Sequence, residues 1–209
     1  MDDIDFPEPN RCYTVEEYLT LERQAQERHE FIDGLVRTIE SSKDRHGILH
    51  ANLVGLLGSQ LKRSPYRPFG KGLLIYCGEP PHEYFSFPDL SIFHGKLEPF
   101  DEHRDVFLNP QIIIEILSPT SEAFDRGEKF IRYRTYLPSL QDYLVVAQDK
   151  LLIERYSRQE NGLWVIAETV SDLVGTIHLP SINCEIPLAE IYEGVVFPEP
   201  PEGSPPSSI

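Results

Sequence analysis

Hydrophobic and polar positions along the chain follow two periods, which predict both helices and strands. A capping box at Thr14-Val-Glu-Glu predicts a helix to about Gln26, and apolar residues at helical spacing predict a second helix over residues 44–62. Between them, Asp33-Gly34 separates two short apolar runs and predicts a hairpin turn. Strands are expected over residues 73–77, 85–93 and 111–117.

The second half of the chain adds one more helix and several strands. A helix is expected over residues 121–136, because Pro119 precedes this segment and Pro138 follows it. A strand, a helix and a strand in succession suit a parallel crossover, whereas the later hairpins suit antiparallel edges. The predicted fold class is therefore α/β, with a mixed central β-sheet flanked by helices and antiparallel edge hairpins. The later strands are expected over residues 143–147, 151–156 and 163–168.

The length of the chain, 209 residues, suits one ordinary domain. We expect this single domain to span residues 13–197, because no long linker, repeat or low-complexity tract interrupts that region. Residues 1–12 are acidic and predict a flexible N-terminus. Residues 198–209 are rich in proline and predict a disordered tail.

Charge and composition narrow the range of partners. The chain has 34 acidic and 19 basic residues, a formal net charge of −15. A field of this sign repels phosphate backbones and anionic lipid, so any nucleic-acid contact must be local or metal-assisted. No signal-peptide pattern opens the chain and no apolar run approaches the ~18 residues of a membrane span, so we expect a cytoplasmic protein without a membrane partner. The three cysteines are never at C-x-x-C spacing, which argues against a disulfide framework and a cysteine zinc site.

One glutamate interrupts the most apolar segment of the chain, Gln111-Ile-Ile-Ile-Glu-Ile-Leu-Ser, which is typical of a strand buried on both faces. Alternation along the strand places Glu115 on the same face as Ile113 and Leu117. An ionised carboxylate there costs roughly several kcal/mol unless a cation or hydrogen-bond donors meet it. Glu115 is therefore either a functional group or the partner of a local arginine or helix N-terminus.

Two further residues suggest that Glu115 does not act alone. Pro88-Asp89 interrupts an apolar strand, which is typical of an edge, a bulge or a kink, although the same pair is also common in simple turns. If the two strands are adjacent, each presents one carboxylate, which suits a hard cation such as Mg²⁺. Lys129 follows on the next helix and either faces these carboxylates or forms a solvated ion pair with Asp125.

Several segments, taken in order, resemble one family. They resemble the patterns Y-E-L-I-D-G, P-D, E-V-L-S-P-S-T and D-x-x-x-K-x-x-x-Y of the Uma family of restriction endonucleases, within the restriction-endonuclease-like PD-(D/E)XK nuclease superfamily. A looser likeness joins Asp142-Tyr-Leu144 to the family's E-Y-W strand, and the whole resemblance covers about residues 13–192. The matching segments are His29-Glu-Phe-Ile-Asp-Gly34, Pro88-Asp89, Glu115-Ile-Leu-Ser-Pro-Thr-Ser121 and Asp125-Arg-Gly-Glu-Lys-Phe-Ile-Arg-Tyr133.

The resemblance implies a restriction-endonuclease-like fold and a metal-dependent endonuclease that hydrolyses phosphodiester bonds of nucleic acid, with DNA the favoured substrate. It implies Asp89, Glu115 and the backbone carbonyl of Ile116 as ligands of Mg²⁺ or Mn²⁺, and Glu30 as an additional catalytic acid. The superfamily's lysine position is occupied by Leu117 in this chain. The resemblance therefore implies that Lys129, on the following helix, is the catalytic lysine.

Basic and polar residues near these positions are candidates for substrate binding. Arg126 and Arg132 share the helix of Lys129 and either contact a nucleic-acid strand or form a solvated helix face. Ser118 lies beside the Glu115 strand. His46 and His50 are one helical turn apart and either contact a phosphate or bind zinc, although the H-E-x-x-H glutamate is absent.

Two other functions stay open at this point. The chain could be a catalytically inactive nuclease-fold module that binds nucleic acid or another partner, an alternative that the net charge of −15 favours. The second alternative is a zinc hydrolase that uses His46 and His50. Cutting both strands of a duplex needs two sites, so a homodimer is also expected for an active endonuclease.

Overall fold

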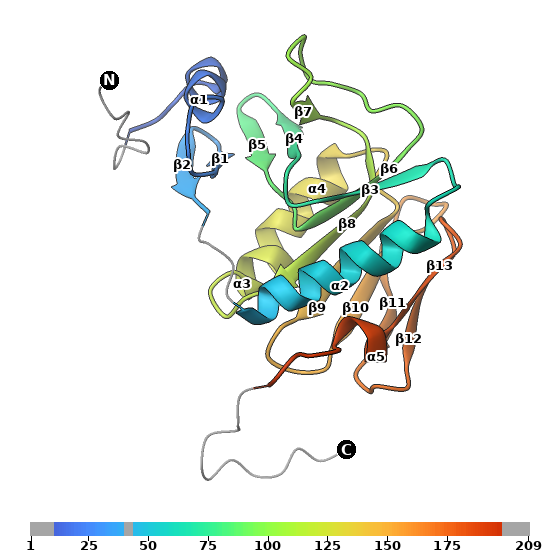
Figure 1. Cartoon of the computed structure of the whole chain (residues 1–209). Helices are drawn as coiled ribbons and strands as arrows, with labels where there is room; N and C mark the ends of the chain where they lie inside the picture. The colour runs from blue at the N-terminus through green and yellow to red at the C-terminus, as the bar shows by residue number, and fades with distance from the viewer. Residues whose placement is uncertain (1–10, 40–43, 198–209) are drawn as a thin grey trace.

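A six-stranded sheet lies at the centre of the computed structural model, which describes residues 11–39 and 44–197 (Figure 1). Its strand order is β11-β10-β9-β8-β6-β3. β8 and β9 are parallel and every other pair in this sheet is antiparallel, so the sheet is mixed, as predicted. The strands are β3 (Tyr66–Gly70), β6 (Leu90–His94), β8 (Pro110–Leu117), β9 (Asp142–Ala147), β10 (Ile153–Arg158) and β11 (Trp164–Val170).

A second, five-stranded sheet carries the N-terminal part of the chain in the order β2-β1-β5-β4-β7. The predicted hairpin turn is confirmed: Asp33 and Gly34 have φ angles of 49° and 92°, the left-handed conformation that a two-residue turn requires. A separate hairpin follows the six-stranded sheet. The strands are β1 (His29–Ile32), β2 (Leu35–Thr38), β4 (Leu74–Glu79), β5 (His82–Ser86) and β7 (Val106–Phe107), and those of the hairpin are β12 (Thr176–Leu179) and β13 (Cys184–Pro187).

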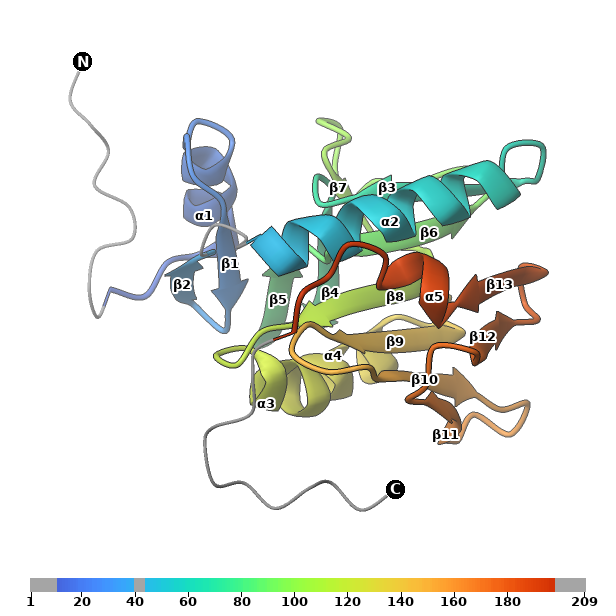
Figure 2. The same ribbon diagram turned by 60° about the horizontal axis from the view of Figure 1, so that its bottom comes forward.

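Helices cover both faces of the six-stranded sheet. Figure 2 shows α2 on one face, with α5 beside it, and α4 on the other. α2 buries Leu49, Leu53 and Leu57, one per turn, against the sheet. The helices are α1 (Val15–Glu22), α2 (Asp44–Gln60), α3 (Glu122–Phe124), the π-helical turn η1 (Asp125–Lys129), α4 (Phe130–Tyr136) and α5 (Leu188–Ile191).

Strand β8 divides the core in two, as its alternation predicts. Ile112, Ile114 and Ile116 pack on the α2 side, in one apolar cluster. Ile113 and Leu117 pack on the α4 side, in another. Each face of β8 is therefore buried under a helix, which explains why the strand is apolar throughout except at Glu115.

The structure corrects several predicted boundaries. Residues 85–93 are not one strand: β5 ends at Ser86, β6 begins at Leu90, and the chain passes from one sheet to the other between them. Pro88 lacks a backbone N–H, which suits a break in the hydrogen-bond ladder. The first helix ends at Glu22 rather than near Gln26. The sequence pattern also missed β3, β7, β12, β13 and α5.

The predicted capping box of α1 is confirmed and gives a direct stability test. The Glu17 backbone N–H donates to Thr14 Oγ1 at 3.2 Å, and the Thr14 N–H donates to Glu17 Oε2 at 2.9 Å. Thr14→Ala is expected to lower the free energy of unfolding by about 1 kcal/mol, because it leaves one helix N–H without this partner. Urea denaturation would measure the loss, and Thr14→Ser should retain most of the stability.

The predicted termini lie almost entirely outside the described residues, since 1–10 and 198–209 are not described. The single domain over 13–197 stays a prediction. None of the helices in the described part of the chain combines the length and the apolar character needed to cross a membrane.

Candidate active site

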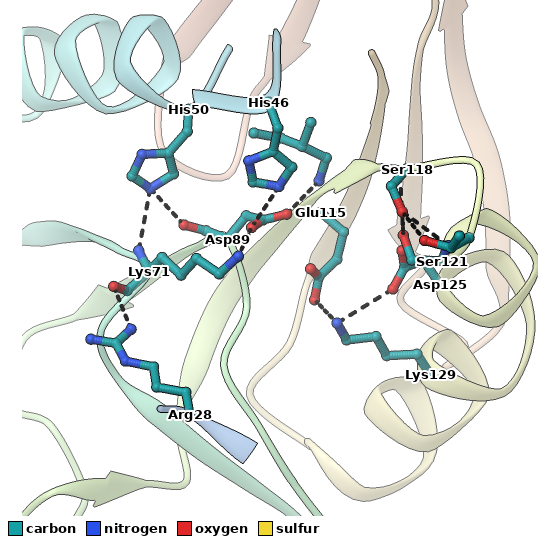
Figure 3. A network of polar contacts seen from close by, with 12 residues as sticks. Arg28, His46, His50, Lys71, Asp89, Glu115, Ser118, Ser121, Asp125 and Lys129 are labelled. Carbon is teal, nitrogen blue, oxygen red and sulfur yellow. Dashed lines mark hydrogen bonds and ion pairs between the residues drawn. The ribbon is translucent and has the colours of Figure 1, made fainter. Parts of the chain in front are cut away.

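A cavity of about 480 Å³ lies where the two sheets meet, and acidic and basic side chains line it. Its carboxylates come from separate elements: Glu30 from β1, Asp89 from the junction between β5 and β6, Glu115 from β8 and Asp125 from η1. Lys71 and Lys129 bring ammonium groups to the same cavity. Figure 3 shows Lys71 on the Asp89 side of this group and Lys129 on the Glu115 side.

Asp89 is held by donors on both carboxylate oxygens. The Ile116 N–H donates to Oδ2 at 2.8 Å, which ties Asp89 to the neighbouring strand β8. His46 Nε2 lies 3.0 Å from Oδ1, and Lys71 Nζ lies 3.5 Å from the same oxygen. Burial works to raise the Asp89 pKa, but these donors and charges outweigh it and hold the pKa below its ordinary value. Asp89 is therefore an ionised carboxylate at neutral pH.

Glu115 is 3% exposed and faces Lys129. Lys129 Nζ lies 2.9 Å from Glu115 Oε1, and the Tyr133 hydroxyl donates to the same oxygen at 3.2 Å. Burial, together with the charges of Asp125 and Asp89, raises the pKa of Glu115 to about 8, although Lys129 works against the rise. The site thus places an acid with a low pKa beside one with a high pKa, a combination that is frequent at functional sites.

Lys129 lies among three carboxylates. Besides Glu115, its ammonium is 3.3 Å from Asp125 Oδ1 and 3.5 Å from Glu30 Oε1. Burial disfavours the charged amine, but the carboxylates around it raise the Lys129 pKa well above its ordinary value. The pair with Asp125 that the sequence suggested is present, yet it is buried rather than solvated, because the Lys129 side chain is 7% exposed.

A π-helical turn presents this lysine. Asp125 and Lys129 are the first and last residues of η1, and both are buried. Such turns occur mostly within α-helices and are frequent at functional sites. Tyr133 follows one turn later, in α4, and also faces Glu115. The spacing i, i+4, i+8 therefore brings an acid, a lysine and a tyrosine to one face of the helix.

His46 and His50 have separate contacts and do not face one shared metal position. His46 lines the cavity through its contact with Asp89. His50 Nε2 lies 3.0 Å from the Asp89 carbonyl oxygen and 3.2 Å from the Lys71 backbone nitrogen, so it contacts backbone. Ser118 lines the cavity and its hydroxyl bonds to those of Thr120 and Ser121. This geometry does not favour the zinc alternative.

The structure does not bring Arg126 and Arg132 to the cavity. Arg126 forms ion pairs with Glu122 and Glu154. Arg132 contacts Asp33 Oδ2 at 2.6 Å and Glu128 Oε1 at 2.8 Å. Carboxylates from distant parts of the chain therefore hold both guanidinium groups, which sequence spacing on the helix could not reveal.

Sequence reasoning missed two residues of the site. Lys71 was notable only as one of the few basic residues of the chain, in the turn Gly70-Lys-Gly72, and it received no role in the site. Tyr133 matched the family pattern but received no role, although its spacing from Lys129 indicated a shared helix face. Both reach the site through tertiary contacts.

The donor set is suited to a hard cation that keeps several waters. Within residues 11–39 and 44–197, no three His, Cys, Asp or Glu side chains form a ready-made metal cluster. Lysine and histidine instead engage the carboxylates. Mg²⁺ needs only one or two protein carboxylates, with water and substrate oxygens for the rest, whereas zinc favours a closed set of nitrogen and sulfur ligands. Asp89, Glu115 and the cavity beside them therefore suit Mg²⁺ rather than zinc.

A mixed sheet flanked by helices, with one acid on β8 and another just before β6, is consistent with a restriction-endonuclease-like α/β fold. The Uma2 family model, described as "Putative restriction endonuclease", matches residues 15–205, and the chain therefore belongs to this family. A crystal structure of "a putative nuclease belonging to DUF820" from Anabaena variabilis has the same fold, with a TM-score of 0.70, 19% identity, and coverage of 88% of this chain and 99% of that chain.

Two relatives from Synechocystis sp. are similar over most of their length. The one called uncharacterized protein slr1290 is 30% identical over 184 residues, which are 87% of this chain and 92% of the relative. The one called uncharacterized protein sll1609 is 31% identical over 162 residues, which are 78% of this chain and 90% of the relative. These similarities agree with the family assignment, but neither relative has a described activity.

Proposed function

We propose that the protein is a metal-dependent endonuclease that hydrolyses phosphodiester bonds of nucleic acid, with DNA as the favoured substrate and Mg²⁺ (or Mn²⁺) as the cofactor. Membership of a restriction-endonuclease family supports this proposal. The observation that carries it is the buried Lys129 ammonium, 2.9 Å from Glu115, in a cavity that Asp89 also lines. A cavity with convergent polar groups and perturbed pKa values is the usual setting of an active site.

Asp89 and Glu115 are the proposed metal ligands, with the carbonyl of Ile116 as a third. The Ile116 N–H bond fixes the position of Asp89 relative to β8, and Tyr133 orients Glu115. When bound, the divalent ion would supply an activated water and a polarised phosphate. Hard oxygen donors that neighbouring strands hold in place are the protein's contribution to that binding.

Lys129 and Glu30 have different proposed roles from the metal ligands. Because the surrounding carboxylates keep Lys129 protonated, its ammonium can stabilise the negative charge that grows on the phosphate during hydrolysis. Glu30 lies 3.5 Å from that ammonium and accepts a hydrogen bond from the Tyr84 hydroxyl at 3.1 Å. It therefore orients the lysine from the five-stranded sheet, whereas Asp125 contacts the same ammonium from η1.

A metal titration is the first test. Mg²⁺ at about ten times its dissociation constant stabilises the folded state by about 1.4 kcal/mol, so the melting temperature should rise by roughly 3–6 °C. Asp89→Asn and Glu115→Gln should each lose most of this rise, because each removes one charged ligand. Differential scanning calorimetry or fluorimetry would measure the shift, with Asp105→Asn as the control. Asp105 is a carboxylate paired with Arg23 away from the cavity.

The control defines what would contradict the proposal. An equal rise in the wild type and in the two site variants would place the metal elsewhere. A loss in the site variants, together with no cleavage of plasmid, oligonucleotide or RNA by the wild type, would favour the inactive binding module instead. A homodimer, measured by analytical ultracentrifugation, is expected if the enzyme cuts both strands.

A further inference from the structure

We propose that Lys71 binds a phosphate of the nucleic-acid strand, as a second cationic group that works alongside Lys129. This inference rests on the proposed nuclease function and assigns a substrate contact within the same site. Lys71 lines the cavity, and its Nζ lies 3.5 Å from Asp89 Oδ1. A phosphodiester next to the Asp89 carboxylate would therefore lie within reach of the Lys71 ammonium.

The turn that carries Lys71 is held on both sides. Arg28 Nη1 donates to the Lys71 carbonyl oxygen at 2.7 Å, and the guanidinium of Arg28 also lies over the Phe87 ring, 5.0 Å from its centroid. His50 Nε2 lies 3.2 Å from the Lys71 backbone nitrogen and, in its other tautomer, can donate to the Asp89 carbonyl oxygen at 3.0 Å. Figure 3 shows this chain of contacts from Arg28 through Lys71 to Asp89.

Gly70 allows the turn to approach His50. A Cβ at this position would lie 2.9 Å from His50 Nε2, closer than such atoms ordinarily come. The backbone of Lys71 is therefore fixed against α2 by a residue without a side chain. A fixed backbone beneath a lysine lowers the entropy lost when the ammonium binds a ligand, which is a feature of pre-organised binding sites.

Two other groups lie closer to the Asp89 carboxylate than the Lys71 ammonium does. The Ile116 N–H at 2.8 Å and His46 Nε2 at 3.0 Å already engage the two carboxylate oxygens. The Lys71 contact, at 3.5 Å, is the longest of the three. Asp89 is therefore held mainly by other groups, and the long stem of Lys71 gives its ammonium the reach to contact an anion in the cavity.

The two lysines differ in exposure and surroundings. The Lys129 side chain is 7% exposed and has three carboxylates around its ammonium, whereas the Lys71 side chain is 23% exposed. Lys129 is therefore suited to the reacting phosphate deep in the site, and Lys71 to a phosphate that enters from the solvent side. In a chain with a net charge of −15, such a local cation offsets the repulsion of the strand.

Binding and salt dependence test this role separately from catalysis. The probes are a fluorescein-labelled DNA duplex and the matching single strand, titrated in CaCl2 and followed by fluorescence anisotropy at several salt concentrations. Lys71→Met should weaken binding about tenfold or more and reduce the slope of log K against log salt by about one, because one phosphate contact is lost. Lys71→Arg should keep the slope.

Lys62→Met is the matched control, because it removes the same charge from an exposed lysine after the far end of α2. At about 1.5 Å per residue, Lys62 lies roughly 20 Å or more from His46. Lys62→Met should leave the Mg²⁺-dependent rise in melting temperature unchanged. Lys71→Met should keep this rise or enlarge it, because it removes a cation 3.5 Å from Asp89. If Lys71 only neutralises Asp89, the variant should bind DNA with the affinity and salt slope of the wild type.

The outcomes separate this inference from the proposed function. If the wild type binds and cleaves nucleic acid and Lys71→Met shows the same affinity and salt slope, the role of Lys71 is overturned and the nuclease proposal stands. If the wild type neither binds these probes in CaCl2 nor cleaves them in MgCl2, the proposed function fails and the Lys71 role fails with it.

Discussion

Lys129→Met is expected to lower the rate of nucleic-acid hydrolysis by about a hundredfold to a thousandfold at saturating Mg²⁺, the loss typical of removing one pre-organised group that stabilises charge in the transition state. The charge of Lys129 is set by Glu115, Asp125 and Glu30, all within 3.5 Å of its ammonium. Methionine keeps most of the length of the side chain and removes the ammonium, with its charge and its hydrogen-bond donors. Single-turnover cleavage of a labelled oligonucleotide would measure the effect on chemistry.

A structural role of Lys129 must be separated from a catalytic one. Removing the ammonium leaves the carboxylates of Glu115 and Asp125, both buried, and that of Glu30 without their cation, so the metal-free variant should melt at a lower temperature than the wild type. Mg²⁺ should still stabilise it, since Asp89 and Glu115 are intact. Lys96→Met, at an exposed lysine in the turn after β6, is the charge-matched control. A Lys129→Met variant that binds Mg²⁺ and cleaves at the wild-type rate would exclude a catalytic role.

The part of the site that lies on regular strands could be predicted from the sequence. Period-two alternation in the 111–117 segment is a local property, so it placed Glu115 on the face of Ile113 and Leu117, where the structure has it. Adjacent strands β6 and β8 then bring Asp89 close to this strand. Spacing along the helix left two alternatives for Lys129, a position facing these carboxylates or a solvated pair with Asp125, and the resemblance favoured the first.

Residues that reach the site through tertiary contacts could not be predicted in this way. Lys71 enters from a turn between the two sheets, and its position depends on the distant Arg28 and His50. For Arg132 the sequence left a substrate contact or a solvated helix face open, yet the structure pairs it with Asp33, almost a hundred residues earlier in the chain. Local spacing carries no information about such partners, since a charge on a helix face looks the same whether a carboxylate or solvent meets it.

The packing around position 117 suits leucine, which this chain has where the superfamily pattern has lysine. Leu117 is 3% exposed and lies in the apolar cluster beneath α4, with Phe130 and Tyr143. A lysine at that position would bury its charge in this cluster unless the helix moved away. The π-helical turn η1, which leads into α4, supplies the ammonium instead, so the strand can keep its apolar packing while the site keeps its cation.

The pH dependence of stability should reveal the proton on Glu115. Its pKa is raised by burial to about 8 in the folded protein, from an ordinary value of 4.5. Between these values the folded state holds a proton that the unfolded state releases, so raising the pH opposes folding. The stabilising contribution is complete below pH 4.5 and is lost as the pH rises through about 8.

Glu115→Gln mimics the protonated acid and does not titrate, which makes it the reference for this effect. In EDTA, the free energy of unfolding of the wild type should fall relative to Glu115→Gln as the pH rises from 5 to 8, by on the order of a few kcal/mol. Urea denaturation at three pH values would measure the difference. A difference that stays flat across this range would show that Lys129 keeps Glu115 ionised throughout. Adding MgCl2 at pH 8 should restore stability to the wild type but not to the variant, because the cation replaces the lost proton only where the carboxylate is present.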